Sequence, residues 1–427
     1  MISFSNLKEL SFLVYGLGSS GQSVVRFFKK KNIKNYKVWD DKDKKLLKSK
    51  RAKKLNNVIS KVNYIVLSPG ISLKNSKNKD QLKKFKEKII TDIDLFYLTN
   101  KKFKSIVVTG TNGKSTTCKL ITHLLKKNKY KVLVGGNIGK PILDLKLKKN
   151  SYVVIEASSF QLSHSKFICP DYALLLNITN DHLDWHQNIK TYTNSKFKIF
   201  NLQKKNQFAI IQDKLKKNFK KRKFSSNLII SKLKRYSEIK NKIKNLYLKS
   251  NINIENMSYV YTLSKLLKIN DKNFISSMRT FIGLPHRYEI FLKRKNVVFI
   301  NDSKATSFEA AKYALSSSKN IYWILGGLPK KNDKIILKEI KENITKAYII
   351  GNNISFFKKQ IKNKINFYTS KNLKNSVIKI MKDIKLSNKT STILLSPAAA
   401  SYDQFLNFEK RGEEFKKLSK LYARKYI

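Results

Sequence analysis

The segment from Thr109 to Thr117 has the residue types and spacing of a loop that binds nucleotide phosphates. It reads Thr-Gly-Thr-Asn-Gly-Lys-Ser-Thr-Thr and follows the apolar residues Ile106-Val107-Val108. A glycine-rich turn between a strand and a helix directs several backbone N–H groups at one point, and a lysine adds positive charge. The residues expected to bind ATP here are Gly110, Thr111, Asn112, Gly113, Lys114, Ser115 and Thr116.

This loop is a shortened variant, because Val108 stands where the usual eight-residue pattern has its first glycine. The hydroxyl of Ser115 or Thr116 could bind Mg²⁺ beside the phosphates. The alternative is a Gly-Lys turn in which Ser115 only caps an ordinary helix.

A second glycine-rich segment, Gly16 to Gly21, follows a short apolar run near the N-terminus, and Asp40 follows the next predicted strand. Alone, this pattern predicts a dinucleotide site, so an NAD enzyme is a rival hypothesis. That hypothesis leaves the loop at Gly110 without a role. Two phosphate sites favour a ligase that uses ATP together with an activated nucleotide-sugar.

Carboxylates and a histidine follow the strands predicted beside the phosphate loop. Glu156 ends the apolar run Tyr152 to Ile155, and His182 lies in Asn177-Ile178-Thr179-Asn180-Asp181-His182. Because parallel strands end at one edge of a sheet, these side chains predict a Mg²⁺ site, with Glu156 as the strongest candidate. In the last part of the chain, Arg287, Lys304 and Lys330 lie in motifs that could bind carboxylates or a transferring phosphoryl group.

The elements that must position these residues alternate along the chain. Short apolar runs and amphipathic helical stretches follow one another, which is typical of parallel α/β sheets. Three successive α/β units are expected, with boundaries near Thr91 and near Gly283-Leu284-Pro285: 1–91, 92–283 and 284–427. The strands are expected at 12–15, 37–39, 64–67, 106–109, 131–134, 152–155, 172–177, 297–300, 321–325, 347–350 and 391–395, with further runs at 208–211 and 228–230.

Composition favours a folded protein of several domains. The chain has 427 residues, of which 41% are hydrophobic, and no run of about 18 apolar residues. Two cysteines give no disulfide framework, so a soluble, cytoplasmic protein is expected. The net charge of +62 is spread over most of the chain. It would suggest a nucleic-acid-binding NTPase only if a recognition motif or aromatic platform accompanied it.

Taken in order, these motifs resemble the Mur ligases of bacterial cell-wall synthesis, and the resemblance spans almost the whole chain. The most specific segments are 110–116, 136–139, 158–162, 301–306 and 396–412. The resemblance implies a Rossmann-like domain that binds UDP, a central ATPase domain and a Rossmann-like C-terminal domain for the amino acid. The N-terminal and C-terminal segments are most similar to those of the branch that adds D-glutamate.

The resemblance also implies residue roles. Catalytic roles fall to Lys114, His182, Lys196 and Lys304, and metal binding to Ser115, Glu156, His182 and Lys196, with Lys196 at the position of a carbamylated lysine. ATP would also contact Asn253, His286, Arg287 and Asp302. The UDP substrate would contact Gly18, Ser19, Asp40, Asn137 and Ser158, and D-glutamate would contact Thr306, Lys330, Ser401 and Phe408.

The implied reaction is ATP-driven amide formation between UDP-N-acetylmuramoyl-L-alanine and D-glutamate through an acyl phosphate, with ATP and two Mg²⁺ ions. A monomer without a membrane span or a specific nucleic-acid partner is expected. The rival hypotheses are a sister ligase that adds another amino acid or uses folate, a nucleic-acid-dependent NTPase, and a scaffold protein. One departure from the family is Asp41, which stands where a threonine commonly follows the uridine carboxylate.

Overall fold

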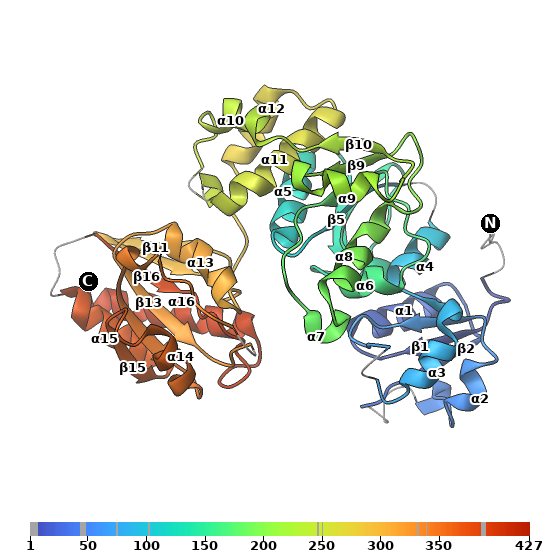
Figure 1. Ribbon diagram of the computed structural model, residues 1–427, viewed down its shortest axis with the longest axis horizontal. Helices are drawn as coiled ribbons and strands as arrows, with labels where there is room; N and C mark the ends of the chain where they lie inside the picture. Colours follow the sequence, from blue (N-terminus) through green and yellow to red (C-terminus); the bar gives the residue numbers. More distant parts are fainter. Residues whose placement is uncertain are drawn as a thin grey trace. The chain divides into compact units, whose positions relative to one another are not determined.

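The computed structural model describes residues 7–42, 48–73, 76–100, 103–245, 247–249, 251–330, 333–338, 340–385 and 390–427 (Figure 1). The chain divides into two compact units. The first comprises Met1–Lys244 and Glu255–Phe281, and the second comprises Asn245–Ile254 and Ile282–Ile427. No helix among the described residues combines the length and the apolar character that crossing a bilayer requires.

The first unit holds two parallel sheets. The N-terminal sheet has the order β2-β1-β3-β4, and the central sheet has the order β10-β9-β8-β5-β7-β6. The N-terminal strands are β1 (Phe12–Tyr15), β2 (Tyr36–Trp39), β3 (Tyr64–Leu67) and β4 (Ile89–Ile90). The central strands are β5 (Phe103–Thr109), β6 (Val132–Gly136), β7 (Ser151–Glu156), β8 (Tyr172–Leu175), β9 (Phe208–Ile211) and β10 (Asn227–Ile230).

Helices connect these strands, as expected of crossover connections between parallel strands. They are α1 (Ser19–Lys30), α2 (Asn56–Ile59), α3 (Lys79–Lys84), α4 (Asp92–Thr99), α5 (Lys114–Lys127), α6 (Ser159–His164), α7 (Leu183–His186), α8 (Ile189–Phe197), α9 (Lys216–Lys220), α10 (Leu233–Lys240), α11 (Asn251–Leu266) and α12 (Asp271–Arg279). Helix α11 begins in the second unit and continues into the first.

Alternating residues of the N-terminal strands enter two different cores. Phe12 and Val14 pack with Phe28 of α1 on one face of the sheet. Leu13 and Tyr15 belong to a second cluster on the other face, which α2 and α3 help to cover. This alternation follows from the two-residue period of a strand, and it places the ends of β1 and β2 beside the start of α1.

The second unit is built on one sheet with the order β11-β12-β16-β13-β14-β15, in which β11 is antiparallel and the other strands are parallel. Its strands are β11 (Glu289–Arg294), β12 (Val297–Asn301), β13 (Ile321–Gly326), β14 (Ile344–Ile350), β15 (Phe367–Lys371) and β16 (Ser391–Leu395). Its helices, besides the start of α11, are α13 (Phe308–Ser316), α14 (Ile354–Ile361), α15 (Leu373–Lys385) and α16 (Phe408–Tyr426).

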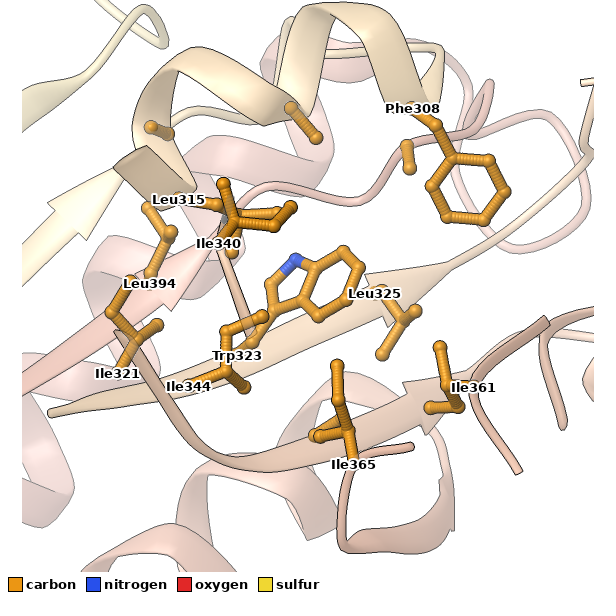
Figure 2. Close-up of a cluster of buried hydrophobic side chains, with 14 of the residues drawn as sticks. Phe308, Leu315, Ile321, Trp323, Leu325, Ile340, Ile344, Ile361, Ile365 and Leu394 are labelled. Atoms are coloured by element: carbon orange, nitrogen blue, oxygen red, sulfur yellow. The ribbon is translucent and has the colours of Figure 1, made fainter. Parts of the chain in front are cut away.

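Strand β13 shows how this sheet is sandwiched between helices. Ile321, Trp323 and Leu325 point into a core with Phe308 and Leu315 of α13 and with α14 (Figure 2). The intervening Tyr322 and Ile324 point to the other face, where α15 and α16 pack. Trp323 is fully buried, and its Nε1–H donates to Ser396 O at 2.8 Å. The core thereby supports the loop after β16, which carries candidate site residues.

The predicted α/β class with parallel sheets is confirmed, and every predicted strand is present with its ends shifted by at most a few residues. Sequence patterns did not indicate three strands: β4, β11 and β15. Strand β4 has only two residues, and β11 and β15 lie at the edges of their sheet, where the alternation of apolar residues is weaker. The predicted division into 1–91, 92–283 and 284–427 remains a prediction.

Candidate functional site

The phosphate loop lies between the end of β5 and the start of α5. Gly110 has φ +154° and Gly113 has φ +83°, values that favour glycine. A Cβ at Gly113 would overlap the side-chain oxygen of Asn256. The backbone N–H of Asn112 donates to Asn177 Oδ1 at 2.8 Å. The segment after β8 therefore holds the loop by a hydrogen bond, and Asn256 of α11 leaves no room for a side chain at Gly113.

The start of α5 is suited to an anion. Gly113 is the N-cap and no side chain caps the helix there, and the first turn contains no acidic residue. Lys114 Nζ donates to Gly110 O at 2.8 Å and to Thr111 O at 2.7 Å. The lysine thus lies over its own loop, and the helix dipole adds partial positive charge at the same place. Ser115 and Thr116 are buried in the first turn.

Glu156 ends β7 beside this loop, since it pairs in register with Val108 of β5. It is 2% exposed. Its Oε1 accepts from Asn137 Nδ2 at 2.8 Å, whereas its Oε2 is buried with no hydrogen-bond partner among the described residues. A buried carboxylate oxygen without a partner is unfavourable. The side chain therefore fits a cation, and oxygen is the ligand that Mg²⁺ prefers.

Lys196, on α8, also reaches the phosphate loop. It is 1% exposed, its Nζ donates to Gly110 O at 2.7 Å, and the Nζ lies 4.5 Å from the centre of the Tyr192 ring. Burial, and then the positive charge of Lys114, lower the pKa of Lys196 well below its usual value. Burial thus favours the neutral amine relative to the ammonium more strongly here than in water. Tyr192 itself bonds to Thr111 through the two hydroxyls at 3.0 Å.

His182 lies in a different environment. It has φ +52°, and its side chain is 43% exposed. Its Nε2 lies 3.4 Å from Asp181 Oδ2, and its ring packs on Phe160 with centres 4.8 Å apart. Among the described residues, no three His, Cys, Asp or Glu side chains form a metal cluster. The expected role of His182 as a metal ligand stays a prediction.

The residues expected to meet the muramoyl peptide have structural roles as well. Ser158 is the N-cap of α6 and forms a capping box with Gln161. The amide of Gln161 in turn donates to Asp92 Oδ1 at 3.4 Å. Burial raises the pKa of Asp92. Sequence reasoning included Gln161 in the segment 158–162 but did not indicate its contact with Asp92, because no motif links the start of α4 to α6.

At the N-terminal sheet, Asp40 braces the glycine-rich turn. Its Oδ2 accepts from Leu17 N at 2.6 Å, and its Oδ1 accepts from Lys42 N at 2.8 Å. Gly18 and Ser19, at the start of α1, are exposed beside this turn. The structure brings these three predicted UDP-binding residues to one end of the sheet.

Asp41 is a residue of this region to which sequence reasoning gave no role. Its carboxylate accepts from the Tyr15 hydroxyl at 2.9 Å, from Trp39 Nε1 at 2.9 Å and from Asn78 Nδ2 at 2.9 Å. The donors come from the ends of β1 and β2 and from the segment before α3. Only their spacing in the folded sheet reveals the cluster.

In the second unit, the loop after β12 carries Asp302 and Lys304. Asp302 accepts from the Ser396 hydroxyl at 2.7 Å and from Tyr288 N at 3.0 Å. Burial raises the pKa of Asp302 to about 7, against the opposing effect of these hydrogen bonds. Lys304 Nζ lies 3.6 Å from the centre of the Phe408 ring. The backbone N–H of Lys304 donates to His286 O at 3.0 Å.

The start of α16 connects the loops that follow β12 and β16. Arg411, which is 1% exposed, donates from Nε to Ser303 Oγ at 3.0 Å. Its Nη2 donates to Ser303 O at 2.8 Å and to Ala399 O at 2.9 Å. Ser303 Oγ donates to Phe408 O at 2.8 Å. Arg411 lies in the segment 396–412 that the sequence singled out, but sequence reasoning gave it no role of its own.

The other residues predicted for this unit lie on several loops, and an antiparallel bridge between Leu328 and Ala400 joins the segment after β13 to the loop after β16. Thr306 precedes the N-cap of α13, and Lys330 is exposed in the segment after β13. Ser401 is buried in the loop after β16, and Arg287 follows His286. Asn253 belongs to the start of α11, where its Nδ2 donates to Tyr247 O at 2.8 Å.

Comparisons with known proteins agree with this geometry. The Mur ligase middle domain matches residues 108–281, and the Mur ligase MurD-like N-terminal domain matches residues 10–90. A UDP-N-acetylmuramoylalanine–D-glutamate ligase of Rickettsia felis is 37% identical over 442 residues, which cover 95% of this chain and 96% of the relative. The ligase of the same name from the Wolbachia of Brugia malayi is 35% identical over 482 residues, covering 96% of each.

Solved structures show the same fold at lower identity. The MurF ligase of Thermotoga maritima, in complex with ADP, matches with a TM-score of 0.60 and 16% identity. The match covers 99% of this chain and 100% of that chain. At this identity the likeness concerns the fold alone.

Proposed function

Because this chain belongs to the Mur ligase family, we propose that it joins D-glutamate to UDP-N-acetylmuramoyl-L-alanine at the expense of ATP. The chain is an ATP-dependent ligase of peptidoglycan precursor synthesis. The observation that carries the assignment of the ATP site is the convergence of Lys114 and Lys196 on one carbonyl, Gly110 O, beside the buried Glu156.

The first step is phosphorylation of a carboxylate. The L-alanyl carboxylate attacks the γ-phosphorus of ATP, the bond to the bridging oxygen breaks, and ADP leaves. An acyl phosphate results, which is a far better acyl donor than a carboxylate. The N–H groups at the start of α5 and the ammonium of Lys114 stabilise the negative charge of the transferring group.

Glu156 and Lys196 both lie beside the phosphate loop, and their side chains have different chemistry. Glu156 offers a carboxylate oxygen, and the neutral amine of Lys196 can attack CO₂, forming an N–C bond and releasing a proton. The resulting carbamate is anionic, so the pair would hold a divalent cation with the hydroxyl of Ser115 and with His182. A Mg²⁺ ion held by these residues would neutralise phosphate charge during the transfer.

The second step is attack of the D-glutamate amine on the acyl phosphate, with release of inorganic phosphate. Thr306, Lys330, Ser401 and Phe408 are the residues proposed to hold the amino acid. Lys304 lies against the Phe408 ring, so a cation is available next to this group. On the nucleotide, Asn253, His286, Arg287 and Asp302 would contact the base and ribose.

The remaining contacts belong to the nucleotide substrate. The turn at Gly18 and Ser19, braced by Asp40, is suited to a diphosphate at the start of α1. Asn137 and Ser158 would contact the muramoyl peptide. We further propose three functional domains, 1–91, 92–283 and 284–427, in a cytoplasmic monomer.

The test of this function is phosphate release by the purified protein in the presence of ATP, Mg²⁺ and UDP-N-acetylmuramoyl-L-alanine. D-Glutamate is compared with L-glutamate, L-alanine and a diamino acid. Release that requires both the nucleotide substrate and D-glutamate is expected. Release that requires a different amino acid would assign a sister activity, and release with no pair would overturn the proposal.

A further inference from the structure

The ring of His286 is unusually constrained for a residue in a loop. His286 has φ +61°, is 7% exposed, and packs edge-on against Phe408 with ring centres 6.0 Å apart. Its Nδ1 lies 2.9 Å from Asn301 Nδ2. Which ring nitrogen of a neutral His286 carries the proton therefore depends on which atom of the Asn301 amide faces Nδ1.

Three neighbours determine the orientation of that amide, and the most distant is Gly412 O, which lies 3.4 Å from Asn301 Nδ2. Asn301 Nδ2 lies 3.0 Å from Glu289 Oε2, and Asn301 Oδ1 accepts from Ser303 N at 3.2 Å. An ionised carboxylate only accepts hydrogen bonds and a backbone N–H only donates them. The NH₂ group must therefore face Glu289 and His286. Exchanging the two amide atoms would break both bonds.

Glu289 is itself fixed in place. Its Oε2 also accepts from His286 N at 2.9 Å, and its Oε1 accepts from Lys416 Nζ at 3.0 Å. These bonds outweigh the effect of burial, so the pKa of Glu289 is lowered and the carboxylate stays ionised. Because Asn301 Nδ2 can only donate, Nδ1 of His286 must accept. The ring proton of a neutral His286 is then on Nε2.

Gly412 allows helix α16 to approach this ring. A Cβ at Gly412 would overlap His286 Nδ1 and would come within 3.0 Å of both amide atoms of Asn301. Glycine inside a helix is less favourable than alanine by about 1 kcal/mol. A glycine here lowers helix propensity, and it leaves the space that the Asn301–His286 pair occupies.

We propose that Asn301 and Gly412 are positioning residues for the nucleotide, holding His286 as a neutral imidazole that donates a hydrogen bond from Nε2 to ATP. Within the described chain, Nε2 has no hydrogen-bond partner. The inference rests on the proposed contact between His286 and ATP. It adds the tautomer of the ring and the two residues that determine it.

The charges around the ring agree with a neutral state. Burial lowers the pKa of His286, and the charge of Lys416 lowers it further. Three nearby carboxylates oppose this effect, but the net shift of the pKa is downward: Glu289, Glu409 and Glu413. Near pH 7.5 the ring is therefore uncharged. The donor at Nε2 is then set by the hydrogen bond at Nδ1 and not by an added proton.

The tautomer can be measured without any substrate. ¹⁵N NMR of protein labelled in its five histidines reports which ring nitrogen carries the proton, and His286→Gln assigns the signal. At pH 7.5 we expect an unprotonated Nδ1 in the wild type. In Asn301→Asp a carboxylate replaces the donor, so Nδ1 becomes protonated. A protonated Nδ1 in the wild type would overturn the inference.

The link to the nucleotide is tested with Gly412→Ala and a matched control, Ser419→Ala, in the same helix. Both changes raise helix propensity, but Ser419 is buried about two helical turns further along α16, and its hydroxyl has no hydrogen-bond partner in the described part of the chain. Gly412→Ala should raise the KM for ATP at least tenfold with kcat changed less than threefold. Ser419→Ala should change neither.

A double-mutant cycle shows whether Gly412→Ala acts through His286 or through a general disturbance of the fold. In a His286→Gln background, Gly412→Ala should have no further effect on the KM for ATP, because the ring it displaces is absent. An unchanged KM for ATP in Gly412→Ala, or a full additional loss in the double variant, would refute the link. Neither result would affect the proposed ligase activity of the wild type, which is measured separately.

Discussion

Replacement of Lys196 by methionine should lower kcat strongly and change the free energy of unfolding only slightly. The wild-type Nζ makes one hydrogen bond, to Gly110 O, and that carbonyl also accepts from Lys114 Nζ at 2.8 Å, so it keeps a partner. Losing one such bond costs about 1 kcal/mol, and methionine fills a similar volume. The free energy of unfolding should therefore change by no more than about 1.5 kcal/mol, and Tm by no more than about 4 °C.

Turnover should respond very differently. Methionine cannot take up CO₂ or supply a metal ligand, so we expect kcat to fall at least about 1000-fold, equivalent to about 4 kcal/mol in the barrier. The matched control is Lys198→Met, which removes a half-buried lysine whose Nζ donates to Ser163 O at 2.5 Å outside the phosphate loop. Thermal unfolding and ADP release are measured on both variants. Turnover of Lys196→Met above a tenth of wild type, or an equal loss in Lys198→Met, would refute the reasoning.

Three further predictions concern Gly113, Asp302 and Glu156. Gly113→Ala should raise the KM for ATP at least tenfold in steady-state kinetics, because Gly113 has φ +83° and an added Cβ would overlap Asn256. The control Gly70→Ala should leave this KM unchanged, since its Cβ would meet nothing within 4 Å. Because burial raises the pKa of Asp302 to about 7, its carboxylate is lost as pH falls through 7. ATP affinity, titrated from pH 8.5 to 5.5, should decline in that range in the wild type but not in Asp302→Asn. Glu156→Gln should raise the Mg²⁺ concentration for half-maximal ADP release at least tenfold, because the change removes the negative charge of a carboxylate whose Oε2 has no hydrogen-bond partner among the described residues.

The parallel strands were predictable because buried strands give uninterrupted apolar runs. Phe12–Tyr15 and Ser391–Leu395 match the prediction to the residue, and the phosphate loop follows its strand as expected. Edge strands such as Phe367–Lys371 were missed, since a strand with one neighbour needs fewer apolar residues. A run of apolar residues indicates a buried strand, so it does not reveal a strand that is only partly buried.

Sequence motifs identified individual site residues but not the side chains that contact and orient them. The sequence indicated Lys114 beside a glycine and Glu156 at the end of a predicted strand, whereas His286 was indicated by the family resemblance. It did not indicate that Asn301 orients His286, or that Arg411 bonds to the loops after β12 and β16. These contacts join residues more than ten, and in one case more than 100, positions apart, and they follow from the packing of α16 on the sheet.

The central claim is that this chain forms an amide through an acyl phosphate. The most direct measurement uses UDP-N-acetylmuramoyl-L-alanine with ¹⁸O in the alanyl carboxylate, together with ATP, Mg²⁺ and D-glutamate, and mass spectrometry of both products. We predict a D-glutamyl product and one ¹⁸O atom in each released phosphate. Phosphate without ¹⁸O, alongside formation of the same product, would contradict carboxylate phosphorylation, and the absence of a D-glutamyl product would contradict the function itself.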